Sequence, residues 1–424
     1  MAIETVDTLI VGGGQSGLAL SEHLSDRGVD HLILERHRIA ERWRSERWDS
    51  LVANGPAWHD RFPSMEFADI DRDAFAPKDA VVNYLVSYAE KIDAPIRCGV
   101  EVLQVRCNTG GPGFCIETSD GDIEAINVVA ATGPFQRPSI PNLVPPMGGI
   151  TQIHSNAYRN PEQLSKGAVL VVGAGSSGVQ IADELLRSGR QVYLSVGPHQ
   201  RPPRSYRCRD YVWWLGVLGK WDAVAVEPGM EHVTISVSGA HGGDTIDFRR
   251  LGARGMVLVG MAQSWQDGTM QFAPDLADNI ARGDANYLSV LDEADAFIAR
   301  YNLELPEEPY AREFEVNPPC LDSPILELNL AQAGVSTIIW ATGYGVDFSW
   351  LKVAAFDESG RPQHQRGVAS EPGIYFLGLP WMLTRGSSFI YGVWHDAMYV
   401  ADHICKQRAY RRYHLSARPM IKDA

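Results

Sequence analysis

The pattern of apolar and polar residues repeats one arrangement twice: an apolar run of strand length, a glycine-rich turn, a helix and a second apolar run. In the first copy these elements are Val6–Val11, Ser16–Arg27 and His31–Leu34. In the second they are Ala168–Val172, Val179–Ser188 and Gln191–Val196. Short apolar runs that alternate with helical periodicity predict parallel sheets covered by helices. We therefore expect an α/β fold with two Rossmann-like dinucleotide-binding domains.

Between the two copies the periodicity changes from helical to alternating. Apolar residues at helical spacing predict a packing helix at 79–91. Alternation then predicts strands at Gly99–Cys107, Gly113–Thr118 and Ile123–Ala130, a small sheet layered on the first domain. The proline-rich stretch Pro134–Pro146 is typical of a connector.

The second half of the chain predicts a return to the first domain. We expect a strand at Thr337–Ala341, a strand at Ile374–Leu377 and a long helix from about Ser388. The first domain is then discontinuous, made of residues 1–147 and 316–424. The second domain, 148–315, carries a helical or irregular insertion at about 205–315. Four tryptophans gather in that insertion and favour core packing or a subunit interface over a substrate pocket: Trp213, Trp214, Trp221 and Trp265.

Both turns read G-x-G-x-x-G. The first glycine permits the tight turn, the second lets the backbone approach a diphosphate, and the third lets the helix pack on the strand. The diphosphate then binds the free N–H groups at the positive end of the helix. The residues expected to hold two dinucleotides are Gly12, Gly14, Gln15, Ser16 and Gly17 in the first turn and Gly173, Gly175, Ser176, Ser177 and Gly178 in the second.

The residue that follows each second strand predicts which dinucleotide binds. Glu35 lies 18 residues after Gly17, where an acid suits the ribose hydroxyls of FAD or NAD but not the phosphate of NADP. The corresponding position of the second copy holds Ser195, followed by Arg201 and Arg204. A small hydroxyl with nearby arginines favours a 2′-phosphate, and hence NADPH over NADH.

Composition excludes several classes of protein. Of the 424 residues, 21% are charged and the net charge is −14, which argues against nucleic acid or an anionic membrane as partner. An apolar strand lies within a few residues of Met1, and no uncharged apolar stretch reaches about 20 residues, so we expect no secretory signal, no membrane span and a cytoplasmic protein. The six cysteines lack C-x-x-C spacing, and we expect no metal.

These features resemble the class B flavin-containing monooxygenases and their bacterial relatives over nearly the whole chain. The resemblance rests on both glycine turns, on two A-T-G turns that include Thr132-Gly133 and Thr342-Gly343, and on a C-terminal stretch that ends at Gly378. It extends to Glu35-Arg36, Trp43 and the S-L-x-x-N stretch Ser50–Asn54. The resemblance implies that these residues bind cofactor, that Val102 flanks the adenine, and that Asn54 lies at the reactive edge of the flavin. A turn residue before Gly55-Pro56 is the alternative for Asn54.

The family fingerprint F-x-G-x-x-x-H-x-x-x-[YW] is only partly present. His154 and Tyr158 match, whereas the phenylalanine and glycine positions hold Gly148 and Ile150. This departure bears on the subgroup and not on the fold. We expect His154 to be a structural residue, buried near the domain junction.

The resemblance implies that NADPH reduces FAD, which forms a C4a-(hydro)peroxyflavin with O2 and transfers one oxygen atom to a small organic substrate. The reaction would be N-, S- or Baeyer–Villiger-type oxygenation, and the sequence does not choose among them. A flavin oxidoreductase without oxygen transfer is the nearest alternative. A dinucleotide-binding redox sensor is an alternative of another class. A homodimer is the default assembly.

Overall fold

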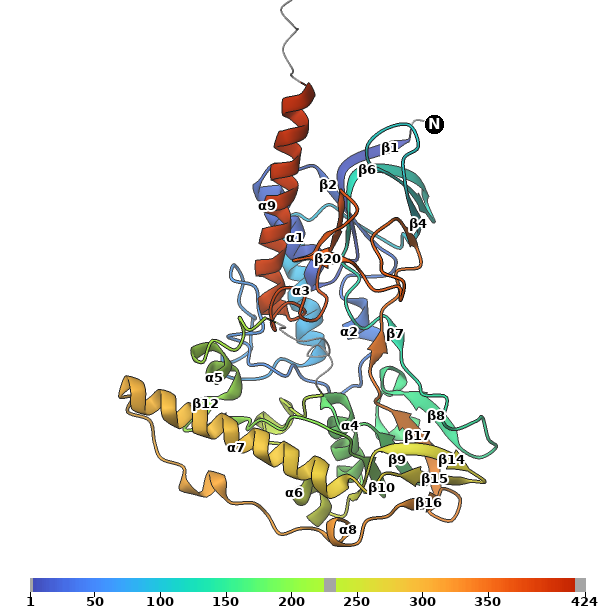
Figure 1. Cartoon of the computed structure of the whole chain (residues 1–424), viewed down its shortest axis with the longest axis vertical. Coiled ribbons are helices and arrows are strands. Elements are labelled where there is room, and N and C mark those ends of the chain that lie inside the picture. Colours follow the sequence, from blue (N-terminus) through green and yellow to red (C-terminus); the bar gives the residue numbers. More distant parts are fainter. Residues whose placement is uncertain (1–2, 225–233, 416–424) are drawn as a thin grey trace, which may run out of the picture.

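The computed structural model describes residues 3–224 and 234–415, which form two α/β domains arranged along the long axis of the molecule (Figure 1). Within these residues, ten strands make the sheet of the first domain, with the central order β19-β4-β5-β6-β1-β2-β3 and with β20, β21 and β22 joined to it through β6. Their bounds are β1 Glu4–Val11, β2 His31–Glu35, β3 Ile96–Cys98, β4 Val102–Cys107, β5 Phe114–Thr118, β6 Gly121–Ala130, β19 Leu351–Lys352, β20 His364–Gln365, β21 Val368–Ala369 and β22 Ile374–Phe376.

Strand β6 joins two parts of this sheet that the sequence predicts as separate layers. One edge of β6 pairs with β1 in parallel from Ile123 to Ala130. The other edge pairs first with β5, up to Ala125, and then with β22 from Val128 onward. The prediction of a layered second sheet is therefore wrong, because the length of β6 lets a single strand serve both partners.

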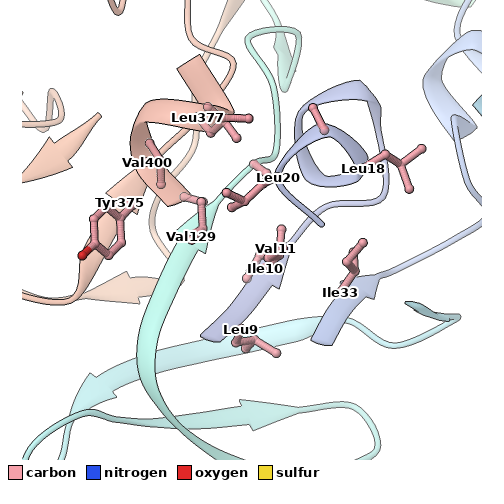
Figure 2. Close-up of a cluster of buried hydrophobic side chains, with 14 of the residues drawn as sticks. Leu9, Ile10, Val11, Leu18, Leu20, Ile33, Val129, Tyr375, Leu377 and Val400 are labelled. Atoms are coloured by element: carbon pink, nitrogen blue, oxygen red, sulfur yellow. The ribbon is translucent and has the colours of Figure 1, made fainter. Parts of the chain in front are cut away.

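Helices pack against the first sheet through their apolar faces. They are α1 Gln15–Asp26, α3 Lys78–Lys91 and α9 Ile390–Leu415, while the short helix α2 Glu41–Ser45 has no buried residue and lies beside α3. The fully buried residues of α9 are Val393, Ala397, Val400, Ala401 and Ile404. Their spacing at i, i+4, i+7, i+8 and i+11 places them on one face of the helix. Figure 2 shows Val400 of α9 and Leu20 of α1 beside Val129 of β6, so the two helices and the strands share one core.

A five-stranded parallel sheet forms the second domain, in the order β13-β10-β9-β17-β8. The bounds are β8 Thr151–His154, β9 Ala168–Val172, β10 Val192–Ser195, β13 Val257–Val259 and β17 Val335–Trp340. All five residues of β9 are buried, as expected for a strand covered on both faces. Helix α4, Ser176–Arg187, follows β9 through the second glycine turn.

The placement of β17 corrects the predicted domain boundary. The sequence predicts that the chain returns to the first domain at residue 316, but β17 lies between β9 and β8 in the second sheet. The return comes instead at β18, Tyr344–Gly345, which pairs with β7, Arg137–Pro138. The two domains are therefore joined where these short strands lie side by side (Figure 1).

The predicted insertion is a mixture of helices and small sheets. Its elements and their neighbours are β11 Ser205–Tyr206, β12 Arg209–Asp210, α5 Tyr211–Val217, α6 Phe248–Ala253, β14 Ala262–Gln266, β15 Thr269–Phe272, α7 Leu276–Tyr301, α8 Pro319–Asp322 and β16 Glu327–Asn329. The tryptophans disperse among these elements: Trp214 is fully buried against α7, Trp265 packs beside the second sheet, and Trp221 stacks on His59 of the first domain.

Candidate functional site

The first glycine turn is tight at its ends and open in its middle. Gly12 has φ +117°, and a Cβ atom there would lie 2.6 Å from the Ala131 carbonyl oxygen. A Cβ at Gly17 would lie 2.0 Å from the Gly12 carbonyl oxygen. A Cβ at Gly14, by contrast, would have no described atom within 4 Å outside its immediate neighbours. The backbone at Gly14 is thus free to contact a ligand at the start of α1.

Glu35 lies at the end of β2, next to this turn. Its two carboxylate oxygens accept hydrogen bonds from the backbone N–H groups of Gly13 at 2.8 Å and His37 at 2.9 Å. These bonds fix the side chain and use two of the roughly four acceptor positions of a carboxylate. Glu35 therefore retains the capacity to accept hydrogen bonds from two ribose hydroxyls.

A cavity of about 610 Å³ extends from the turn toward β4 and the first A-T-G turn. Its lining includes ten of the residues predicted to bind cofactor: Gly12, Gly14, Gln15, Ser16, Glu35, Arg36, Trp43, Val102, Thr132 and Gly133. Gly17 and Gly378 lie behind the turn, where a Cβ at Gly378 would lie 2.0 Å from Ser16 Oγ. Thr342 and Gly343 lie at the domain crossing, where they contact Ser139.

Charged residues that sequence analysis missed also line the cavity. Arg42 pairs with Glu46 at 2.5 Å, and the guanidinium of Arg47 lies 5.9 Å from the ring of Trp43 and 5.2 Å from that of Phe135. Burial lowers the pKa of Arg47. Arg42, Glu46 and Arg47 lie in the stretch 41–47, which contains α2 and follows Glu35 at the end of β2. The arginine-rich composition of this stretch is the sequence signal from which these cavity residues could have been predicted.

The cavity fits an FAD-like dinucleotide by three tests. Space is open beside Gly14, where a diphosphate would lie against the start of α1. An acid with spare acceptor capacity stands where the ribose would lie. The volume lies within the range of about 300–1,000 Å³ typical of ligand pockets.

The second glycine turn has the same tight ends but a covered middle. A Cβ at Gly173 would lie 2.5 Å from the Ala341 carbonyl oxygen, and one at Gly178 would lie 1.8 Å from that of Gly173. A Cβ at Gly175 would lie 3.2 Å from Thr234 Cγ2. The chain itself therefore occupies the space that is open at Gly14.

The predicted role of Ser195 does not agree with the structure. Its side chain is buried, its Oγ donates to the Gly260 carbonyl oxygen at 2.9 Å, and the same Oγ accepts from the Ala262 N–H at 3.1 Å. These bonds tie β10 to the chain that follows β13. Because the hydroxyl already donates and accepts within the protein, it is not presented to a 2′-phosphate.

The predicted roles of Arg201 and Arg204 are likewise wrong in this structure. Arg201 is 3% exposed and donates to Asp284 at 2.7 Å, and Arg204 is 2% exposed and pairs with Asp210. Burial raises the pKa of Asp210 despite the opposing effect of this arginine. Both guanidinium groups thus balance internal carboxylates and do not face a nucleotide.

Asn54 lies where the two domains meet. Its side-chain oxygen accepts from Gln180 Nε2 of α4 at 2.9 Å, and its backbone carbonyl oxygen accepts from Arg204 Nη1 at 2.6 Å. The Asn54 Nδ2 group is then the one that the side chain can offer to a ligand. Gln180 and Arg204 are partners that sequence analysis missed, because both belong to the other domain.

A histidine that sequence analysis also missed lies close to Asn54. His59 Nδ1 lies 2.9 Å from Asp60 Oδ1, and Asp60 Oδ2 accepts from the Gly55 N–H at 3.0 Å. The ring is 5% exposed and lies against Trp221 and Tyr391, with centroids 4.8 and 4.5 Å away. Its buried Nε2 has no hydrogen-bond partner among the described atoms. This group forms an aromatic wall beside the Asn54 turn.

His154 lies in the place expected for it, buried at the domain junction. It is 3% exposed, and its Nε2 lies 2.9 Å from the Gly343 carbonyl oxygen at the domain crossing. Burial lowers its pKa, which favours the neutral ring. The prediction of a buried junction residue is confirmed.

Other kinds of site find no support in the described part of the chain. No group of three or more His, Cys, Asp or Glu residues there has the arrangement of a metal site. The six cysteines are free thiols. No described helix combines the length and the apolar character that crossing a membrane requires.

Comparison with known proteins agrees with this geometry. The family model for pyridine nucleotide-disulphide oxidoreductases matches residues 9–212. A flavin-containing monooxygenase from Stenotrophomonas maltophilia has the same fold, with a TM-score of 0.65 at 19% identity over 96% of this chain and all of that one. The probable indole-3-pyruvate monooxygenase YUCCA1 of Arabidopsis thaliana is 32% identical over 193 residues, 44% of this chain and 46% of that protein.

A further relative matches over nearly its full length. A protein of Geobacillus kaustophilus, described as an uncharacterized CzcO-like oxidoreductase, is 33% identical over 403 residues, 94% of this chain and 98% of that protein. The fold is shared with the flavin-containing monooxygenase of Stenotrophomonas maltophilia. With the identity and coverage of the Geobacillus relative, the chain belongs to the CzcO-like oxidoreductases.

Proposed function

We propose that the protein is an FAD-dependent monooxygenase that uses NADPH and O2 to oxygenate a small organic substrate. The observation that carries the proposal is the first glycine turn, open at Gly14 and continuous with a cavity of about 610 Å³ that Glu35 and Trp43 line. Similarity to flavin monooxygenases by fold, and to YUCCA1 over part of the sequence, supports oxygen transfer.

The chain's own residues would hold and orient the cofactor. The N–H groups at the start of α1 would bind the diphosphate, and Glu35 would accept the ribose hydroxyls. Asn54 would offer its amide N–H to the flavin or the nicotinamide at the domain junction, held there by Gln180 and Arg204. When bound, FAD supplies the hydride acceptor and the centre that activates O2.

Free cysteines favour oxygen transfer over thiol chemistry. The family model that matches residues 9–212 takes its name from disulphide oxidoreductases. In this chain Cys98, Cys107 and Cys208 are exposed free thiols, and the six cysteines lack C-x-x-C spacing. Without a paired dithiol, electrons from a reduced flavin would pass to O2 or to an external acceptor.

The choice of NADPH over NADH rests on the family resemblance alone. Ser195, Arg201 and Arg204, the residues that the sequence predicts near a 2′-phosphate, all bond to other groups of the protein. None of the three is therefore free to bind a 2′-phosphate in this structure. Both coenzymes are therefore compared in the test.

The test begins with the visible spectrum of the purified protein, where bound oxidised flavin is expected. NADPH and NADH oxidation, O2 uptake and H2O2 release are then measured across a panel of amines, sulfides and ketones. Substrate-dependent O2 uptake with little H2O2 supports a monooxygenase. Coenzyme oxidation that yields only H2O2, or that needs an electron acceptor, supports the reductase alternative. A protein that binds no flavin contradicts the proposal.

A variant pair tests the role of Asn54. Asn54→Ala is expected to raise the H2O2 released per coenzyme oxidised, because the flavin edge loses a hydrogen-bond donor. Asn108→Ala, in the turn between β4 and β5, is the matched control and should leave this ratio unchanged. Equal ratios in the two variants would remove Asn54 from the reactive site.

A further inference from the structure

Residues 234–239, here called the covering segment, lie across the second glycine turn. Ser176 Oγ, at the start of α4, donates to the Ile235 carbonyl oxygen at 2.9 Å. Ser236 Oγ donates to the Ala174 carbonyl oxygen at 2.6 Å. Thr234 Cγ2 occupies the space beside Gly175. Three consecutive residues of the segment thus contact the turn itself.

The other side of the covering segment faces the first domain. A Cβ at Gly239 would lie 2.2 Å from the Ala53 carbonyl oxygen and 2.7 Å from the ring of Phe75. The Val237 carbonyl oxygen accepts from Gln180 Nε2 at 3.0 Å, the same nitrogen that donates to Asn54. The segment therefore lies between the start of α4 and the turn that carries Asn54.

The position of the segment matters because a diphosphate needs the same space. In this type of fold the diphosphate lies against the second glycine and the first N–H groups of the helix. Here the threonine methyl stands beside that glycine and the Ile235 carbonyl is bonded to the first helical side chain. A dinucleotide and the segment cannot both occupy the turn.

The contacts of the segment are polar, which makes it displaceable. Ser236 is fully buried, and hydrogen bonds tie the segment to Ala174, Ser176, Gln180 and Gln200, whereas Ile235 and Val237 belong to none of the hydrophobic clusters of the described residues. A hydrogen bond contributes only about 0.5–1.5 kcal/mol net, because water or a ligand replaces it when it opens. Phosphate oxygens would offer such replacements to the groups of the turn.

We propose that the covering segment is an internal lid of the pyridine-nucleotide site, and that the coenzyme must displace it to bind. The inference rests on the proposed use of a pyridine nucleotide at the second domain. A site that is open for only a fraction of the time binds its ligand more weakly by that fraction. Variants that weaken the lid contacts should therefore bind the nucleotide more tightly.

Two variants weaken the lid without touching the glycine turn. Ser236→Ala removes the bond to Ala174 and should lower the Kd for NADP+ by about threefold to tenfold, the value of one net hydrogen bond. Thr234→Ser removes only the methyl beside Gly175 and should lower the Kd by about twofold. Ser238→Ala is the matched control, because Ser238 Oγ accepts from the nearby Ala240 N–H and not from the turn.

The experiment titrates the flavin-loaded protein with NADP+ and, separately, NAD+, and follows amide hydrogen exchange by peptide. Ordinary ligand binding slows exchange at every contact. Displacement of a lid predicts the opposite at 234–239, where the Ser236 N–H donates to the Gln200 carbonyl oxygen at 2.8 Å and the Gln200 N–H to that of Thr234 at 2.8 Å. Exchange there should accelerate while exchange at 173–178 slows.

The outcomes separate the two proposals. Nucleotide binding with exchange at 234–239 unchanged or slowed, or with all three serine and threonine variants alike, overturns the lid and leaves the proposed function intact. Failure of the wild type and of both lid variants to bind either nucleotide overturns the pyridine-nucleotide part of the proposed function together with the lid. Tight binding by Ser236→Ala with weak binding by wild type supports both.

Discussion

The two glycine turns of this chain share a sequence spacing and differ in access. In both, the first and third glycines lie so close to backbone carbonyl oxygens that a Cβ would collide with them. At the second glycine the turns diverge, because Gly14 faces open space and Gly175 faces Thr234. The motif therefore specifies the backbone of the turn, and a distant part of the chain decides whether a ligand can reach it.

The largest effect is expected at Arg204, which is buried at the domain junction beside the turn that carries Asn54. Its guanidinium links Asp210 to the Asn54 carbonyl oxygen across the domain junction. Arg204→Ala leaves the partly buried Asp210 carboxylate without its cation and the Asn54 carbonyl oxygen without this donor, and should lower the free energy of unfolding by about 3–5 kcal/mol, measured by urea denaturation. Arg209→Ala, at an exposed position on β12, should cost under about 0.5 kcal/mol. Unchanged stability with a selective rise in the NADPH KM would restore Arg204 to a 2′-phosphate site.

Asp396 tests the packing of α9 against α1, the helix that follows the first glycine turn. It lies on α9, which packs against α1, it is 3% exposed, and burial raises its pKa to about 6. Because the pKa of Asp396 in the folded protein exceeds its ordinary value of 3.8, ionisation of this carboxyl destabilises the folded state. The free energy of unfolding therefore falls as the pH rises from about 4 to about 6. Two pKa units correspond to about 3 kcal/mol.

The variant that isolates this effect is Asp396→Asn. Its gain in unfolding free energy over wild type should grow between pH 4 and pH 7 and then level off. Asp402→Asn, at an exposed position on the same helix that pairs with Arg27, is the control. A pH-independent difference for Asp396→Asn would contradict the assignment.

The third glycine tests what the two turns have in common. Gly17→Ala and Gly178→Ala each place a methyl group within about 2 Å of a backbone oxygen, so both should lower the unfolding free energy by about 2 kcal/mol. Gly110→Ala, where a Cβ meets open space, should change it little. A marked difference between Gly17→Ala and Gly178→Ala would show that the two turns are not equivalent even in their backbone.

The second glycine tests how the two turns differ, with the smallest expected effects. Gly14→Ala should leave the melting temperature of the flavin-free protein unchanged and weaken FAD binding by about tenfold, or about 1.4 kcal/mol, because the methyl enters ligand space. Gly175→Ala should lower the melting temperature slightly, because Thr234 must shift. Flavin content after dialysis and thermal unfolding measure the two quantities. A fall in melting temperature for Gly14→Ala would show that its neighbourhood is not open.

The strand, turn and helix of each of the two repeats could be predicted from the local sequence. The strand, turn and helix of each copy follow from runs such as Ala168–Val172 and from glycines that only one backbone path accommodates. The order of the strands within each sheet was harder to predict. The apolar run at 335–340 suits any buried parallel strand, so its place between β9 and β8 in the second sheet could not be read from its own residues.

The failures at the second site have the same origin. Arg201 and Arg204 follow the motif closely enough to resemble phosphate ligands, yet Arg201 finds its partner, Asp284, 83 positions later. Ser236 bonds to Ala174, 62 positions earlier, in a stretch where the sequence predicted no site residue. Burial and ion pairing over such separations depend on tertiary packing, which periodicity and spacing do not encode.

The junction of β7 and β18 has a consequence for how this architecture can be modified. The chain leaves the first domain at Arg137–Pro138 and re-enters it at Tyr344–Gly345, and these strands pair directly in register. The second domain is therefore a cassette inserted at one point of its host. A two-residue hairpin turn in place of 139–343 would reconnect the first domain without stretching either strand, and a homologous cassette could be exchanged at the same pair of cuts.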